Sequence, residues 1–166
     1  ESNSYEFLMH IGPGIKKLDE SELLQLLALA EENNVGIAGG IVRDERGRIQ
    51  DAGLNLTNDH KIVFPYHGNL IRNPGYQGLG SVENNILVPS IHLFASRTKV
   101  LLENYREGFS CLDLCIRLCE RGYFNVLRPQ MSGIVSGGTQ VNKDRYRTVG
   151  KAPKKSTDYP IYLCDV

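Results

Sequence analysis

Residues 109–129 have the sequence FSCLDLCIRLCERGYFNVLRP, and this stretch decides the fold of the chain. An acidic residue, Asp113, lies at the start of an amphipathic helical pattern, and Gly122 ends that helix. The apolar run over residues 123–127 predicts a strand, which we expect Pro129 to close. A helix followed directly by a buried strand is a building unit of α/β domains.

Upstream of this stretch, the pattern predicts further alternation of strands and helices. Residues 5–9 form a short strand, and residues 10–14 form a loop because of their glycines and proline. Asp19 caps a helix, with Glu22 as its capping-box partner. The buried stripe of that helix repeats at helical spacing and consists of Leu23, Leu26, Leu27 and Ala30.

The middle of the chain predicts a hairpin followed by a long loop. Residues 35–42 (VGIAGGIV) form a buried strand, residues 43–48 a charged turn around Gly47, and residues 49–56 a return strand. Residues 57–81 form a long ordered loop, and loops of this length in compact domains are usually functional. Residues 85–96 form a strand pair or one bent strand interrupted by Pro89, and residues 98–104 a short helix. These elements predict an α/β domain with a mixed sheet over residues 1–136 and a polar, basic tail over residues 137–166.

Composition limits the classes of function. The chain has 166 residues, and its 19 Lys and Arg balance its 19 Asp and Glu. A neutral domain of this size gives no reason to expect nucleic-acid binding. No apolar run approaches the length of a membrane span. The basic residues of the tail fit two interpretations, a peripheral contact with anionic lipid head groups or a solvated, flexible end. They are Lys143, Arg145, Arg147, Lys151, Lys154 and Lys155.

Three of the four cysteines recur every fourth residue, at Cys111, Cys115 and Cys119, and the fourth is Cys164. On a helix the first three form one stripe. Three thiols on one face could ligate a metal, but the usual ligand spacing is tighter. Burial as small apolar residues is the favoured interpretation. Free cysteines without a secretory signal predict a reducing, cytoplasmic setting.

The order of these motifs resembles the acceptor-side, C-terminal part of family 2 glycosyltransferases, which have the A-type fold. The text of residues 113–123, Asp-Leu-Cys-x-Arg-Leu-x-x-x-Gly-Tyr, is similar to the family's acceptor-side helix. Residues 46–53, RGRIQDAG, are similar to its Asp-Gly-Arg-Ile-Gln-x-Ala-Gly hairpin. The resemblance covers residues 5–136. It implies transfer of a sugar from a nucleotide donor to a glycan or lipid-linked acceptor, with Mg²⁺ or Mn²⁺ bound by acidic residues.

The acidic motifs of the family are degenerate in this chain. The metal-binding acids should lie near His10, Ile11 and Gly12, and the general base should occupy the position of Cys111. A neutral thiol is a poor base for a hydroxyl proton, and a histidine alone is a poor ligand set for Mg²⁺. We therefore expect the isolated chain to be weak or inactive in sugar transfer and to act as a binding or assembly module.

The resemblance also assigns candidate binding residues. Donor phosphate would lie near His10, Gly12 and Lys16, in a segment that also fits a plain surface loop. Acceptor contacts would come from Tyr66, His67, Tyr76, His92 and Arg117, with His60 nearby in sequence. The aromatic side chains among them would stack on sugar faces or pin the long loop to the domain. Asp113 would orient an acceptor hydroxyl or cap its helix, and Arg117 would contact an acidic group or pair with Asp113.

Two alternatives stay open. The chain would be an active glycosyltransferase if another chain or an N-terminal segment supplied the nucleotide-holding half. Asp113 would then take the base role, and Lys16, Lys17 or Arg128 would replace the metal. Alternatively, the likeness would extend to the fold alone, and the chain would be a non-enzymatic protein-interaction module.

Overall fold

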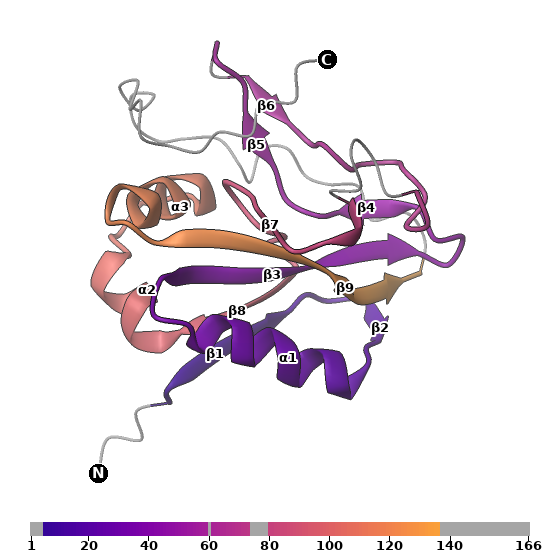
Figure 1. Cartoon of the computed structure of the whole chain (residues 1–166), viewed down its shortest axis with the longest axis horizontal. Coiled ribbons are helices and arrows are strands. Elements are labelled where there is room, and N and C mark those ends of the chain that lie inside the picture. Colours follow the sequence, from indigo (N-terminus) through magenta and orange to yellow (C-terminus); the bar gives the residue numbers. More distant parts are fainter. Residues whose placement is uncertain (1–4, 60, 74–79, 137–166) are drawn as a thin grey trace.

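The computed structural model describes residues 5–59, 61–73 and 80–136. Figure 1 shows an α/β domain in which helices flank a mixed, seven-stranded sheet. The tail predicted over residues 137–166 lies outside the described residues. Within the described ranges, every helix is too short or too polar to span a bilayer.

The sheet has the order β1-β8-β3-β9-β2, with β4 added to β3 and β7 added to β9. Its strands are β1 (Phe7–Ile11), β2 (Ile15–Lys17), β3 (Val35–Asp44), β4 (Ile49–Asp51), β7 (Asn84–Asn85), β8 (Leu93–Arg97) and β9 (Phe124–Val135). The central pair, β3 and β9, is parallel, and the other pairs are antiparallel. A separate two-stranded sheet pairs β5 (Asn55–Leu56) with β6 (Ile62–Val63).

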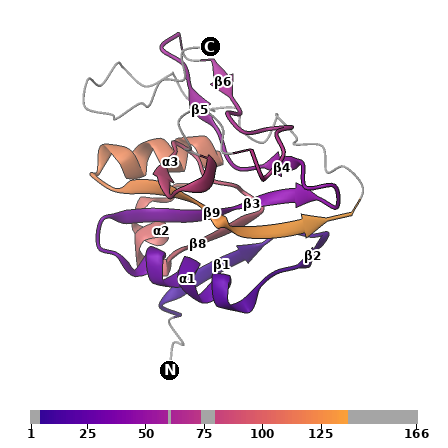
Figure 2. The ribbon, with the colours of Figure 1, turned by 45° about the vertical axis from the view of Figure 1, so that its right-hand side comes forward.

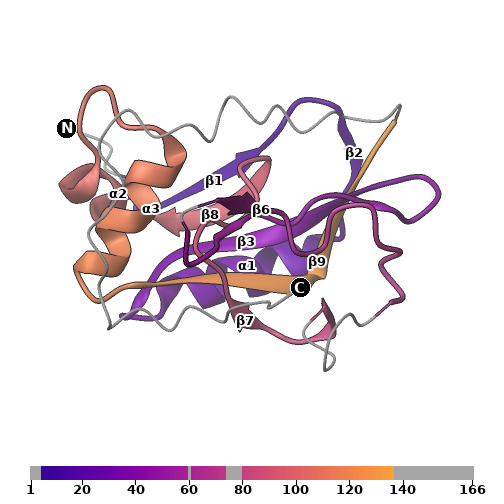
Figure 3. The ribbon, with the colours of Figure 1, turned by 90° about the horizontal axis from the view of Figure 1, so that it is seen from above.

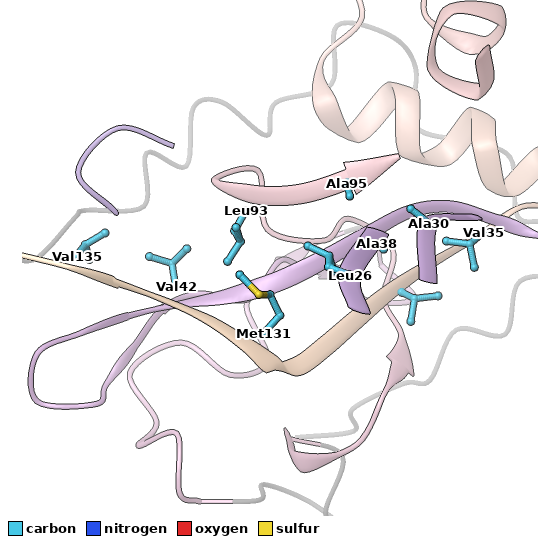
Figure 4. Packing of buried hydrophobic residues seen from close by; sticks show 10 residues of the cluster. Leu26, Ala30, Val35, Ala38, Val42, Leu93, Ala95, Met131 and Val135 are labelled. Carbon is cyan, nitrogen blue, oxygen red and sulfur yellow. The ribbon is translucent and has the colours of Figure 1, made fainter. Parts of the chain in front are cut away.

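Helix α1 (Glu20–Glu31) covers one face of the sheet, and α2 (Thr98–Asn104) and α3 (Cys111–Glu120) cover the other (Figure 2). The alternation of side chains along β3 explains this division. Ala38 packs toward Leu26 and Ala30 of α1, as Figure 4 shows, whereas the neighbouring Ile37 packs toward α2 and α3. Seen from above in Figure 3, α2 and α3 lie together at one end of the sheet.

Each of the two longer helices begins at a polar residue whose side chain caps the helix, and such residues are preferred at this position. Asp19 accepts hydrogen bonds from the main-chain N–H groups of Ser21 and Glu22 at the start of α1. The predicted cap is therefore confirmed, while Glu22 directs its carboxylate at Arg128, with Oε2 3.5 Å from Nε. The predicted helix over residues 98–104 and the buried strand over residues 35–42 are also confirmed.

Three predicted boundaries are wrong. The first strand includes His10 and Ile11, which the sequence pattern places in a loop, because they pair with Phe94 and Leu93 of β8. The return strand divides at Gly53, so residues 55–56 pair with β6 and leave β3. Pro129 does not end the last strand, which continues to Val135. The register with β3 shifts between the Gly39–Leu127 and Ile41–Ser132 pairs, so Pro129 lies in an irregular segment that tolerates its missing N–H.

Candidate functional site

A cavity of about 220 Å³ lies between the sheet and the helices α2 and α3. We call it the α2–α3 pocket. Its helical side consists of Leu101, Leu102, Tyr105, Cys111, Leu114 and Cys115, and its sheet side consists of Ile37, Pro89, Ser90 and Phe94. No charged side chain of the described residues lines it. The pocket is therefore apolar, and the polar side-chain groups of its lining residues are one hydroxyl, one phenol and two thiols.

The sheet wall forms because a glycine in β3 lets the loop before β8 lie directly on the strand. An alanine Cβ at Gly39 would come within 2.3 Å of Cβ of Pro89 and 3.1 Å of the main-chain N of Ser90. Such distances are well inside van der Waals contact, so only glycine fits. The glycines that thin this strand in the sequence thus place Pro89 and Ser90 at the pocket.

A buried carboxylate holds the same loop. Ser90 Oγ donates a hydrogen bond to Asp51 Oδ2 over 2.7 Å, and the Gly53 N–H donates to Asp51 Oδ1 over 3.0 Å. Asp51 and Ser90 are both buried. A buried carboxylate needs such partners, and no local pattern in the sequence signals this pair. Asp51 therefore supports the sheet wall of the pocket.

Cys111 is the first residue of α3 and lines the pocket. The hydrogen bond with Cys115 lowers the pKa of the Cys111 thiol, while burial and the Asp51 charge act less strongly in the opposite direction. A helix N-terminus also favours a thiolate. The hydrogen bond to Cys111, followed by burial, raises the pKa of the Cys115 thiol, and burial raises the pKa of Cys119 to about 11. Among the three described cysteines, Cys111 ionises first.

The cysteine stripe lies on α3 as predicted, with Cys115 fully buried beside Leu112 and Ile116. Cys119 is half-buried, and Asn125 Nδ2 lies 3.6 Å from its sulfur. In the described part of the chain, no group of three or more His, Cys, Asp or Glu side chains is placed to hold a metal ion. Cys164 lies outside that part.

Asp113 caps α3 together with Ser110. Its Oδ2 accepts from the main-chain N of Ser110 over 2.9 Å and from Ser110 Oγ over 2.6 Å, and Ser110 Oγ accepts from the Asp113 N–H. This is a complete capping box, so the capping interpretation is confirmed, with Ser110 as the N-cap residue. Arg117, one turn further along α3, is half-buried, and its Nε has no hydrogen-bond partner among the described residues.

The expected donor-side residues lie on β1, on β2 or between these two strands. His10 stacks on Phe94, a pocket residue, with ring centroids 5.3 Å apart, and the Gly12 N–H donates to the His92 carbonyl over 2.7 Å. Lys16 lies on strand β2, exposed, so the predicted loop around it is replaced by a strand. The residues at the metal-motif position do not fit Mg²⁺ or Mn²⁺, because His10, Ile11 and Gly12 offer no side-chain oxygen.

Arg128, the third expected substitute for a metal, is already surrounded by partners. Its Nη1 contacts the Glu83 carboxylate, its Nη2 contacts the Gln25 carbonyl oxygen, and its Nε lies 3.5 Å from Glu22. We call these four residues the Arg128 cluster. It ties α1, the segment before β7 and β9 together, which indicates a structural role.

The two described acceptor candidates of the long loop, Tyr66 and His67, do not line the pocket. Tyr66 packs on the cluster around Ile49 and Leu127, and His67 Nδ1 lies 3.0 Å from the Gln50 carbonyl oxygen. These contacts support the interpretation that the loop aromatics pin the loop to the domain. Tyr76 and His60 lie outside the described residues.

No protein-family model fits the chain, and no curated protein sequence matches it.

Proposed function

We propose that this chain is a family 2 glycosyltransferase-like domain that does not transfer sugar by itself and that binds an acceptor-like ligand in the α2–α3 pocket. The proposal rests on the motifs of residues 46–53 and 113–123, and it is compatible with the α/β architecture and mixed sheet. The pocket lies at the N-terminus of the helix that carries the second motif.

The observation that carries the proposal is the setting of Cys111. At the base position, a thiol faces an apolar pocket in place of a carboxylate. Two carboxylates are close to Cys111. Asp113 lies two residues further along the chain and accepts hydrogen bonds from Ser110, and Asp51, whose charge acts on the Cys111 thiol, accepts from Ser90 and Gly53. A general base must reach the proton it removes. Both carboxylates here have structural partners, which supports a binding role.

The direct test is a transfer assay with the chain, a panel of nucleotide sugars, Mn²⁺ and lipid-linked or glycan acceptors. We expect no transfer and no donor hydrolysis above the blank. Cys111→Asp restores a carboxylate at the base position, and Cys111→Ser is its matched control. Both variants should stay inactive, because the metal-motif position also lacks acids and members of a catalytic site act as a unit. Transfer by the unmodified chain that disappears on removal of Mn²⁺ would contradict the proposal.

The edge position of β1 favours a second candidate, an active enzyme completed by another chain or an N-terminal segment. β1 is the terminal strand of the sheet and is partly exposed, and open strand edges pair readily with an added strand. In that assembly Asp113 would act as base. Asp113→Asn in the completed enzyme should then abolish transfer while leaving donor binding intact. An unchanged rate would exclude Asp113 from the base role.

A further inference from the structure

The mouth of the α2–α3 pocket is unusually apolar for a protein surface. Leu102 is 73% exposed and Tyr105 is 53% exposed, although both line the pocket. Tyr105 also makes an edge-on contact with Phe109, with ring centroids 6.5 Å apart. Exposed apolar groups around a concave site are typical of ligand-binding surfaces.

The inside of the pocket offers a ligand little hydrogen bonding. Its walls are formed by Ile37, Phe94, Leu101 and Leu114, and the Ser90 hydroxyl already donates to Asp51. A sugar ring in this space would lose hydrogen bonds with water that the walls do not replace, and each unpaired hydroxyl would weaken binding. A hydrocarbon group would lose nothing and would remove apolar surface from water.

We infer that the α2–α3 pocket binds an uncharged alkyl or aryl group, the hydrocarbon part of an amphiphilic ligand whose polar end stays at the mouth beside Leu102 and Tyr105. This inference deepens the proposed function, because it names the chemical class of the ligand for the same site. An apolar cavity of about 150 Å³ holds benzene, so 220 Å³ corresponds to about nine carbon atoms.

The affinities of straight-chain alcohols of increasing length measure directly how large a hydrocarbon group the pocket holds. Each added methylene should strengthen binding about fourfold until the pocket is full, at about nine carbons, and longer chains should gain little. The experiment titrates the full chain with n-butanol to n-dodecanol and follows the methyl NMR signals of isoleucine and leucine. The signals of Ile37, Leu101 and Leu114 should shift together.

A matched pair of variants locates the site. Leu102→Ala removes an exposed leucine at the mouth, and Leu24→Ala removes a leucine that is 64% exposed on α1, across the sheet. Neither residue belongs to the buried core, so both variants should fold. Leu102→Ala should weaken octanol binding about threefold, and Leu24→Ala should leave it unchanged.

Alkylation of Cys111 provides a readout that needs no variant. Bound octanol should slow the reaction of Cys111 with iodoacetamide, measured by peptide mass spectrometry, because Cys111 lines the pocket. Equal affinity for all chain lengths, equal effects of the two leucine variants, or unprotected Cys111 would each overturn the inference. Sugar transfer by the chain would overturn the proposed function but not alcohol binding, so the two failures are distinguishable.

Discussion

Replacing Gly53 by alanine should destabilise the domain far more than the same change at a second glycine with similar backbone geometry. Gly53 has a φ of +89°, and an alanine Cβ there would come within 2.1 Å of the Val88 carbonyl oxygen and 3.0 Å of Pro89 main-chain atoms. At Gly68, φ is +81°, but an alanine Cβ there would meet nothing within 4 Å. The pair therefore separates backbone strain from steric contact.

The expected loss in the free energy of unfolding follows from these contacts. A left-handed conformation costs alanine about 1–2 kcal/mol, and this cost applies to both variants. At Gly53 the clash is with main-chain atoms, so the Val88 segment must move away. That movement breaks the two hydrogen bonds that join Leu54 and Val88, at 2.8 and 3.1 Å. Each contributes about 1 kcal/mol, so Gly53→Ala should lower the free energy of unfolding by about 3–4 kcal/mol and Gly68→Ala by about 1–2 kcal/mol.

Urea unfolding followed by far-UV circular dichroism measures the difference. With a denaturant slope of about 2 kcal/mol/M, the midpoint should fall by about 1.5–2 M for Gly53→Ala and by about 0.5–1 M for Gly68→Ala. Equal midpoints for the two variants would refute the argument, because backbone strain alone would then explain both. The same clash should displace Pro89 and Ser90, so octanol binding should also weaken in Gly53→Ala.

Three further predictions follow from the helices and the Arg128 cluster. Iodoacetamide should modify Cys111 before Cys119, because the pKa of Cys111 is lowered and that of Cys119 is about 11. Peptide mapping across pH should show that the alkylation rate of Cys111 levels off at a lower pH than the alkylation rate of Cys119. The reverse order would contradict this ranking of the two thiol pKa values. Ser110→Ala should lower the free energy of unfolding, measured with urea, by about 1 kcal/mol, since it removes the N-cap of α3. Ser110→Thr keeps the hydroxyl and should retain most of that stability. Arg128→Ala should lower the free energy of unfolding by about 1–3 kcal/mol, because the Glu22 and Glu83 carboxylates lose their cation. If the uncompensated charge of Glu22 is the cause, adding Glu22→Gln to the Arg128→Ala variant should recover part of the loss.

Periodic sequence patterns predicted the helices and the central strand, because each carries its signal within a few residues. The stripe from Leu23 to Ala30 and the apolar run of β3 required no knowledge of partners. Pro129 misled the prediction of β9. A proline ends a regularly paired strand, but the register shift between Gly39 and Ile41 removes that constraint, and only the paired strands reveal the shift.

The site depended more strongly on tertiary structure. Cys111 and Cys115 could be placed on one helix face from their spacing, but the pocket also needs Ile37, Ser90 and Phe94 from distant segments. The acidic residue Asp113 illustrates the opposite case. Its position suggested chemistry, while the local pattern with Ser110 three residues earlier already predicts a capping box. Local hydrogen bonding was therefore the better guide at that position.

The parallel pairing of β3 with β9 has a consequence for how the chain is made. Val35 of β3 pairs with Phe124 of β9, and residues 45–123 are synthesised between the two strands. At roughly 5–20 residues per second, a ribosome takes several seconds to bridge that interval. During this time the apolar segment 35–42 lacks its longest native partner and can pair with other nascent chains. We expect the yield of folded protein to rise when chaperones that hold extended apolar segments are supplied during synthesis.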